Sequence, residues 1–324
     1  MRKLSLTVVI KDYDYITPLL LGEEIADGID LKLDRKSGIA RVTEDPTILA
    51  GETSFSKHLI RLSQGDRRFV GIPFFAYHGF RHRCFFVKRG SPLHTLKDLE
   101  GKRIGTNGWP DTGNTWSRAA LREQGVRIEN IHWWVAPIDD PNAPNHWQGD
   151  EPKNVQPAAP GRTLCEMLIA GELDTLMCPL PPKGFYQADS PIVRLISDYR
   201  KAEQEYYRRT GVYPGHHIIV VQRSLYEREP WVLRSLCDAF DKSKLRWNQT
   251  RAIWAEFSPW MLADIEDAMT FMGSDWHPSS VEPNRKMIQK LCDEEYAQGL
   301  AKQPIDIKSV FAEFETVMQG GAKA

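Results

Sequence analysis

The sequence has no excess of charge of either sign, because 42 Lys and Arg stand against 43 Asp and Glu and leave a formal net charge of −1. Proteins that bind nucleic acid usually carry a basic excess or stripe, so we expect no nucleic-acid partner. No apolar run approaches the roughly 20 residues that span a bilayer, which argues against a membrane protein. The five cysteines are an odd number without a C-x-x-C pair. That pattern is typical of reduced, buried thiols rather than disulfides or a zinc site.

The N-terminal segment lacks the features of an export signal. Met1-Arg2-Lys3 precedes an apolar run over residues 4–10, but the run is short and ends at Lys11-Asp12 without a small-residue cleavage site. Its β-branched residues at 7–10 predict a buried strand instead. We therefore expect a cytoplasmic protein.

What is present is an ordinary globular composition, 41% hydrophobic and 26% charged, over 324 residues. Strand and helix patterns alternate and predict α/β layers with mostly parallel sheets, followed by a mainly helical C-terminal part. The segment 136–162 contains six prolines and predicts a long irregular loop, an insertion in the regular pattern. The strands are predicted at 4–10, 29–33, 69–75, 85–88, 175–178 and 218–221, and the helices at 56–63, 115–124, 163–170, 230–247, 261–271, 284–298 and 310–318. A further helix is predicted to begin at 17–22, and the segment 96–105 is predicted to form a short helical turn that stops at Gly101 and is followed by a strand.

Two segments resemble landmarks of the type 2 periplasmic-binding-protein-like fold. Residues 93–105 resemble the start of its second lobe, and residues 168–175 resemble its helix-Gly-Glu-x-Asp-strand return. The resemblance implies a two-lobed α/β fold with mixed, mostly parallel sheets flanked by helices. Lobe I would comprise residues 1–80 and 218–324, and lobe II residues 81–217 with the insertion 136–162. Receptors, regulators and enzymes share this fold, so it leaves the function open.

More specific motifs resemble one enzyme branch, the 4,5-dihydroxyphthalate decarboxylases. The segment 63–73 is similar to the family's S-x-G-D-R-R-F-V-x-I-P run, and 80–82 to its F-R-H. The segment 203–217 resembles its E-x-x-Y-Y-x-x-T-G-x-x-P-x-x-H signature. Shorter likenesses occur at 12–14, 230–231, 239–240, 259–260, 273–285 and 298–300. The chain departs from the pattern at His216, His277 and Ser279, where the family has Met, an aromatic residue and Tyr.

In a fold of this kind the ligand lies in the cleft beside two strands that cross between the lobes, expected here near 78–87 and 213–221. A guanidinium binds a carboxylate with two parallel hydrogen bonds, so Arg81 is the candidate carboxylate clamp. The near-neutral pKa of imidazole makes His217 and His82 the candidate proton donors. If 78–87 is extended, His82 faces opposite to Arg81, and His216 likewise opposes His217. An Arg paired with a structural carboxylate, and a His bonded to a backbone carbonyl, are the alternatives.

Helix starts supply a second set of anion-binding candidates. Thr112, Asn114 and Thr115 precede or open the helix at 115–124, and Ser54 precedes the helix at 56–63. Free N–H groups at helix N-termini suit a carboxylate, although the same residues are ordinary N-caps. The resemblance adds further substrate-binding candidates from its matching segments: Tyr13, Asp14, His216, His277, Glu282 and Arg285.

The implied activity is non-oxidative decarboxylation of a hydroxylated aromatic carboxylate by ring protonation and CO2 loss in the interlobe cleft. The specific expectation is conversion of 4,5-dihydroxyphthalate to 3,4-dihydroxybenzoate. This chemistry needs no organic cofactor, and the sequence has neither G-x-G-x-x-G nor a P-loop. A divalent metal held by His82, His217 and a distant carboxylate is left open. Also open are a binding protein for a small aromatic carboxylate, a decarboxylase with another substrate, and a homo-oligomer formed through aromatic-rich helices after Trp231.

Overall fold

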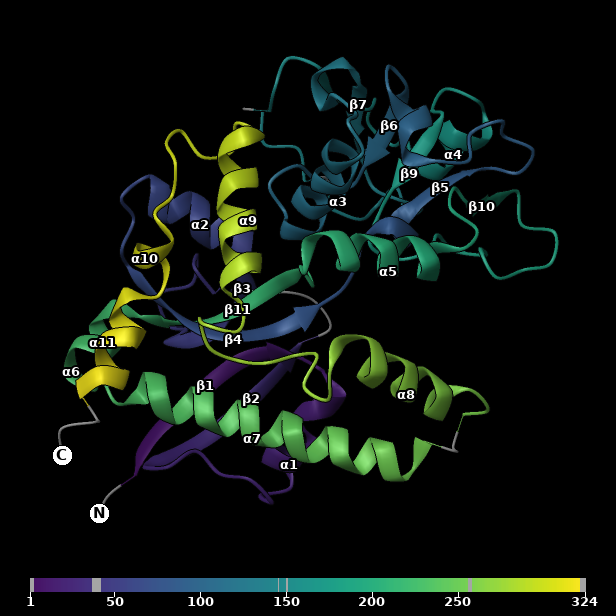
Figure 1. The fold of residues 1–324 in the computed structure, drawn as a ribbon. Coiled ribbons are helices and arrows are strands. Elements are labelled where there is room, and N and C mark those ends of the chain that lie inside the picture. Colours follow the sequence, from purple (N-terminus) through teal and green to yellow (C-terminus); the bar gives the residue numbers. More distant parts are fainter. Residues whose placement is uncertain (1–2, 37–41, 145, 150, 256–257, 321–324) are drawn as a thin grey trace. The chain divides into compact units, whose positions relative to one another are not determined.

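The computed structural model describes residues 3–36, 42–144, 146–149, 151–255 and 258–320 (Figure 1). The chain forms two compact units. Unit 1 comprises Met1–His78, Gly215–Gln289 and Pro304–Ala324, and unit 2 comprises Gly79–Pro214 and Lys290–Gln303. The predicted division keeps 218–324 together, whereas Lys290–Gln303 here lies in unit 2. No helix in the described ranges is long and apolar enough to cross a membrane.

Unit 1 is built on a five-stranded sheet in the order β2-β1-β3-β11-β4. The strands are β1 (Leu4–Lys11), β2 (Ile29–Lys36), β3 (Ala50–Ser54), β4 (Phe69–His78) and β11 (Gly215–Gln222). Strand β1 pairs in parallel with β2 and β3, whereas β11 runs antiparallel to β3 and β4. The sequence predicted every strand of this sheet except β3. That strand consists of small and polar residues, although all five are buried.

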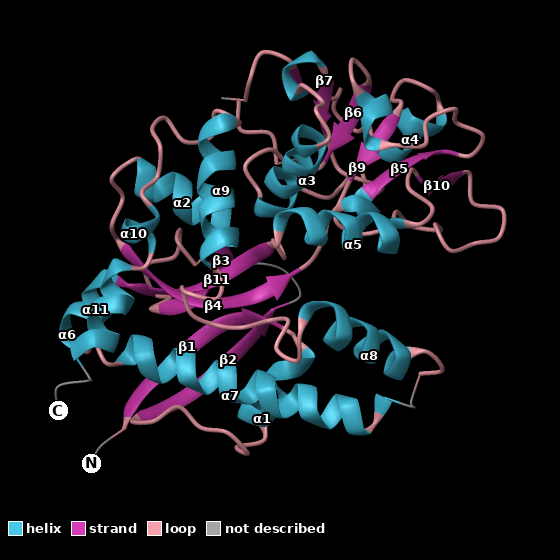
Figure 2. Ribbon diagram, in the orientation of Figure 1, coloured by secondary structure: helices cyan, strands magenta, loops and turns pink. Residues whose placement is uncertain are grey.

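Helices cover both faces of this sheet (Figure 2). Consecutive side chains of β4 point to opposite faces, so Phe74 stacks on Phe240 of α7 at 5.1 Å, while Phe75 packs against Phe55 of α2 at 5.6 Å. Ser54 caps α2, and its hydroxyl accepts a hydrogen bond from the Lys57 amide. The helices of unit 1 are α1 (Thr17–Leu20), α2 (Phe55–Ser63), α6 (Arg223–Arg228), α7 (Val232–Ile253), α8 (Met261–Met272), the first part of α9 (Arg285–Ala297), α10 (Ile307–Val310) and α11 (Ala312–Gly320), with the 3-10 turn η1 (Asp14–Ile16).

Unit 2 is built on a six-stranded sheet in the order β10-β5-β9-β6-β7-β8. The neighbouring strands β9, β6, β7 and β8 are parallel, and β5 is antiparallel to both β9 and β10. The strands are β5 (Phe85–Lys88), β6 (Arg103–Thr106), β7 (His132–Val135), β8 (Val155–Pro157), β9 (Thr175–Met177) and β10 (Ile192–Arg194). The helices and turns are α3 (Thr112–Glu123), α4 (Leu164–Ile169), α5 (Tyr199–Thr210), η2 (His82–Cys84), η3 (Leu96–Leu99) and η4 (Ile128–Asn130).

Three sequence predictions within unit 2 need correction. The proline-rich segment is not wholly irregular, since β8 pairs with β7 at the edge of the sheet, where proline is tolerated. Helix α5 was not predicted, because only Glu203 and Tyr206 of its twelve residues are buried, and a glutamate and a tyrosine do not make the apolar stripe that predicts a helix. The stretch 78–87 is not one extended strand, because β4 ends at His78 and the turn η2 precedes β5. The predicted alternation of Arg81 and His82 across a strand is therefore wrong.

Candidate functional site

Polar side chains gather in unit 1 at the carboxyl ends of two parallel strands. Tyr13 follows β1, Glu52 is the middle residue of the short strand β3, and His217 lies opposite Ser54, the last residue of β3, in the pairing of β11 with β3. Strand β1 has β2 on one side and β3 on the other, so the strand order reverses there. In open α/β sheets, ligands bind outside the carboxyl ends of strands at such a reversal.

Three of these side chains form one hydrogen-bonded cluster. His217 Nδ1 lies 2.5 Å from Glu52 Oε1, and the Tyr13 hydroxyl donates to the same oxygen at 2.6 Å. The Tyr13 hydroxyl is also 3.2 Å from His217 Nδ1. Glu52 Oε2 accepts the Lys11 amide at 2.8 Å. Glu52 is 1% exposed and the His217 side chain 12% exposed, so water is largely excluded from the carboxylate.

Charge and burial fix the protonation of this cluster. Burial is the largest influence on Glu52 and raises its pKa, but hydrogen bonds from His217, Tyr13 and the Lys11 amide outweigh it, and the net pKa is lowered. Burial, and then the nearby Glu52 charge, raise the pKa of Tyr13, so its phenol stays neutral and donates. A carboxylate oxygen only accepts, so we assign a proton to His217 Nδ1 from this hydrogen-bond network. Nε2 is then the nitrogen that gains or loses a proton.

The sequence prediction named Tyr13 and His217 but missed Glu52. The only local sign of it is an acidic residue within the short run before the α2 cap. Its neighbour Ser54 is buried as the α2 cap, and His216 is fully buried with its ring 5.1 Å from that of Tyr77. His216 and His217 differ in exposure, as residues on opposite faces of a strand do.

The other candidates of unit 1 have partners outside the Tyr13–Glu52–His217 cluster. Asp14 pairs with Arg251 at 3.4 Å, and Glu282 with Arg285 at 2.6 Å, all on exposed side chains. His277 Nε2 lies 3.0 Å from the Phe75 carbonyl. Burial, followed by the charge of Lys244, lowers the pKa of His277 to about 3.

The two departures from the family pattern at His277 and Ser279 meet at one lysine. The buried Lys244 ammonium donates to the His277 carbonyl at 2.5 Å and to the Ser279 hydroxyl at 3.0 Å. Asp241 completes the group at 3.0 Å from the same ammonium. These contacts give both residues a role in holding the loop before α9 to α7.

In unit 2, Arg81 lies against the first turn of α3. A β-carbon placed on Gly113 would be 2.8 Å from Arg81 Nη2, so the guanidinium occupies the space that a side chain there would fill. Arg81 is 4% exposed, and its Nη1 is 3.7 Å from the Cys84 thiol. Thr112, Asn114 and Thr115 are at most 4% exposed, and Asn114 Nδ2 donates to the Gly108 carbonyl at 2.9 Å. A guanidinium next to a helix N-terminus gives a positive potential that favours an anion.

The His82 side chain is too deeply buried to donate a proton to a bound ligand. It is 4% exposed, its ring is 5.3 Å from that of Tyr206, and its Nδ1 has no partner among the described residues. The pKa of His82 is lowered to about 4, because burial, with a smaller contribution from the Arg209 charge, outweighs the opposing charge of Glu123. His82 is therefore neutral near pH 7. Within the described part of the chain, no three His, Cys, Asp or Glu side chains are arranged to hold a metal ion.

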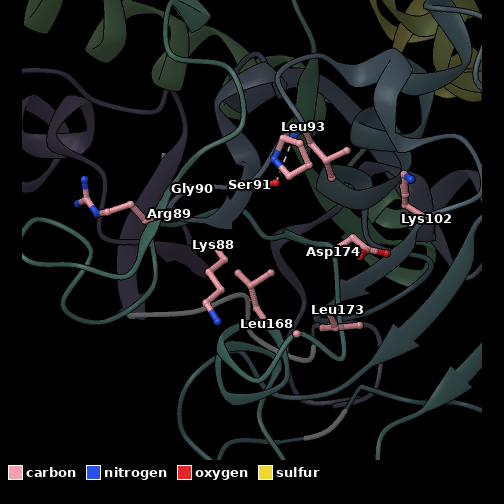
Figure 3. Close-up of a pocket in the computed structure, with 11 residues that line it drawn as sticks. Lys88, Arg89, Gly90, Ser91, Leu93, Lys102, Leu168, Leu173 and Asp174 are labelled. Carbon is pink, nitrogen blue, oxygen red and sulfur yellow. Dashed lines mark hydrogen bonds between the residues drawn. The ribbon is translucent and has the colours of Figure 1, made fainter.

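A cavity of about 390 Å³ in unit 2 is lined by residues that include Lys88, Leu93 and Leu173 (Figure 3). Lys102 and Asp174 line the cavity, and they directly precede the strands β6 and β9. The cavity therefore lies at the amino ends of these strands, whereas α3 follows the carboxyl end of β6. Asp174 is paired with Arg103 at 2.8 Å, and Lys88 donates to the Ile169 carbonyl. None of the predicted site residues lines this cavity, and it faces the ends of parallel strands where ligands seldom bind.

Comparison with known proteins places this geometry in context. The chain is 27% identical over 321 residues to a 4,5-dihydroxyphthalate decarboxylase of Comamonas testosteroni, covering 96% of this chain and 97% of that protein. It is 28% identical over 214 residues to a 4,5-dihydroxyphthalate decarboxylase of Pseudomonas putida, covering 64% and 83%. No family model matches the chain.

Solved structures share the fold at low sequence identity. The periplasmic aliphatic sulphonate binding protein SsuA from Escherichia coli aligns with a TM-score of 0.55 and 13% identity, over 95% of this chain and 97% of that one. The desulfurization enzyme DSZB aligns with a TM-score of 0.51 and 14% identity, over 98% and 100%. The predicted type 2 periplasmic-binding-protein-like fold is thus confirmed. The predicted resemblance is confirmed as well: over almost its whole length, the chain is similar to a 4,5-dihydroxyphthalate decarboxylase.

Proposed function

We propose that this protein is a non-oxidative decarboxylase of a hydroxylated aromatic carboxylate, and specifically of 4,5-dihydroxyphthalate. The observation that carries the proposal is the Tyr13–Glu52–His217 cluster, a buried carboxylate bonded to a partly exposed imidazole. The two curated relatives, both named 4,5-dihydroxyphthalate decarboxylase, support the reaction class.

The chemistry asks for one positioned proton. A hydroxyl para to the departing carboxylate pushes electrons into the ring, and the ring carbon that bears this carboxylate takes a proton from His217 Nε2. The carbon–carbon bond then breaks, CO2 leaves, and the electron pair of that bond restores the aromatic ring. One proton is consumed for each CO2 released. Glu52 keeps Nδ1 protonated and stabilises the imidazolium before transfer, the role of the orienting carboxylate in other acid–base pairs.

In unit 2, the proposal assigns Arg81 and the first turn of α3 to the retained carboxylate of the substrate. The buried guanidinium and the helix N-terminus both attract negative charge, and Thr112 and Thr115 supply hydroxyls on that turn. His82, buried and neutral, is assigned to the support of this turn rather than to proton transfer.

The test is turnover of 4,5-dihydroxyphthalate by purified protein, followed by ultraviolet absorbance together with the CO2 and 3,4-dihydroxybenzoate released. Turnover in the presence and absence of a chelator supports the proposal and shows that no removable metal takes part. Turnover that the chelator abolishes retains the decarboxylase and requires a metal. A second candidate, a binding protein for aromatic carboxylates, is favoured by the fold shared with SsuA. It would gain if the compound raises the melting temperature without being consumed.

Replacement of Gly113 by alanine tests the carboxylate site with little cost in stability. The added methyl group would lie 2.8 Å from Arg81 Nη2 and must displace the guanidinium, which is the far end of a long, buried side chain. We expect KM to rise about tenfold, a loss of about 1.4 kcal/mol of binding. The melting temperature should change little, because the cost of moving the buried guanidinium is offset by the preference of about 1 kcal/mol that alanine has over glycine in a helix. Gly320→Ala is the matched control, since no atom lies within 4 Å of its β-carbon position. An unchanged KM in Gly113→Ala would remove Arg81 from the site.

A further inference from the structure

A second buried carboxylate, Glu203, lies on α5 beside the turn that carries Arg81. Glu203 is 7% exposed and accepts a hydrogen bond from the backbone N–H of Arg83. Its Oε1 has no hydrogen-bond partner within the described ranges. The proposed reaction does not use this group, although Glu203 opens the segment 203–217 that the sequence analysis singled out.

The charged groups around Glu203 are arginines. Arg83 lies in the η2 turn, Arg81 directly precedes that turn, and Arg194 ends β10; all three act on Glu203 by their charge. Arg194 Nε donates to the Arg83 carbonyl at 3.3 Å, and its guanidinium lies 4.9 Å from the Phe185 ring and 5.0 Å from the Tyr199 ring. Aromatic rings on this side hold the arginine in place and keep water away.

Burial dominates the ionisation of Glu203 and raises its pKa to about 7. The hydrogen bond from Arg83 and the charges of Arg83, Arg194 and Arg81 lower the pKa without cancelling that effect. Near neutral pH the group is therefore divided between its neutral and ionised forms. The positive charge of the arginines can be balanced either by the Glu203 carboxylate or by the carboxylate of a ligand that binds from solution.

We propose that Glu203 is a positioning residue that couples the binding of a carboxylate at Arg81 to the uptake of a proton. The inference rests on the proposed carboxylate role of Arg81. An incoming anion repels the Glu203 carboxylate in a corner with little water to screen them, so binding favours neutral Glu203. By linkage, the reverse also holds, and protonation of Glu203 strengthens binding.

The affinity for the anion should decrease as the pH rises. Below pH 7 Glu203 is already neutral and binding is strongest, whereas above pH 7 each bound anion must bring a proton with it. Affinity should therefore fall as the pH rises from about 6.5 to about 8, by up to about tenfold for each pH unit of the linked range. Phthalate is a suitable probe because it is fully ionised throughout this range and has no ring hydroxyl to assist decarboxylation.

The experiment is calorimetric titration of the full-length protein with phthalate near pH 7, in two buffers of different ionisation enthalpy. We expect the apparent enthalpy to differ between the buffers by the amount that uptake of a fraction of a proton requires. In Glu203→Gln the difference should vanish and the affinity should no longer change with pH, while phthalate still binds. Glu205→Gln, an exposed neighbour on α5, is the control and should behave as the wild type. A buffer-independent enthalpy in the wild type, or an unaltered difference in Glu203→Gln, overturns the proposal.

The inference and the proposed function fail separately. Proton uptake on phthalate binding without turnover of 4,5-dihydroxyphthalate would support the role of Glu203 and reject the decarboxylase. Turnover with no proton uptake on binding would do the reverse. If Glu203→Gln does not fold, a buffer-independent enthalpy in the wild type still overturns the proposal, and loss of the buffer dependence in His217→Ala would assign the proton to His217 instead and overturn it as well.

Discussion

Replacement of His217 by alanine is expected to lower kcat on 4,5-dihydroxyphthalate by about 10²- to 10⁴-fold, the usual contribution of a general acid. KM should change much less, because the proposed carboxylate contacts lie on unit 2 residues. The His217 side chain is only 12% exposed and is hydrogen-bonded to the buried Glu52 carboxylate, so its truncation should also lower the melting temperature, and kcat is measured well below that temperature. Steady-state release of CO2 measures the effect. His132→Ala, an exposed histidine in β7, is the matched control.

Glu52→Gln separates the proton donor from its partner. The amide keeps the shape of the side chain and can still accept one hydrogen bond, but it loses the charge that favours the imidazolium. We expect kcat to fall about 10- to 100-fold, with a pH profile that differs from that of the wild type. Glu52→Gln combined with His217→Ala should be no slower than His217→Ala alone, because residues that act as one unit are not additive. Full kcat in both single variants would mean that the proton comes from another group.

The sequence predicted two of the three members of this cluster, Tyr13 and His217, and the distance along the chain explains why Glu52 was missed. His217 closes a motif of several residues within 203–217, which local comparison can detect. Glu52 is 165 residues away from His217. The two meet only because β11 pairs with β3 in a register that sets His217 opposite Ser54. No local pattern within β3 predicts that Glu52 contacts a histidine 165 residues later in the chain.

Arg81 shows the same limit in unit 2. The sequence predicted Arg81 and the start of α3 as separate anion-binding candidates, from residue type and helix start. Arg81 lies against Gly113 of α3 because the turn η2 follows Arg81, whereas the sequence predicted one extended strand over 78–87. Residue type alone was also insufficient at His277 and Ser279. Their polar groups are occupied by Phe75 and Lys244, which lie far away in the sequence.

Acidification is expected to destabilise the protein steeply below about pH 6.5, because several histidines are buried in the neutral form. Burial, then Arg61, lowers the pKa of His58 to about 4. Burial also lowers the pKa of His82 to about 4 and that of His277 to about 3. Above pH 6.5 these histidines are neutral in both the folded and unfolded states, so they do not make the free energy of unfolding depend on pH. As the pH falls from 6.5 towards 4, these histidines bind protons in the unfolded chain but not in the folded chain, so the free energy of unfolding decreases.

Each of these histidines contributes about 2 to 4 kcal/mol to that loss, at about 1.4 kcal/mol for each pKa unit. A domain has only about 5 to 15 kcal/mol of stability, so the protein should approach unfolding near pH 4. Glu203 acts in the opposite direction between pH 7 and 4.5, since its pKa is raised, but it offsets only about one histidine.

His58→Leu isolates one of these contributions. His58 is 3% exposed, and its Nε2 has no partner among the described residues, so leucine fills a similar space without leaving a buried donor or acceptor unsatisfied. Urea unfolding at about pH 7.5 and pH 5 should show that the variant loses about 1 to 2 kcal/mol less than the wild type over this interval. His94→Leu, at an exposed position, should lose as much as the wild type. Parallel losses in His58→Leu and the wild type would show that His58 is protonated in the folded protein. The acid sensitivity would then come from His82, His277 and the Glu52–His217 pair, where a falling pH protonates a carboxylate whose pKa the fold has lowered.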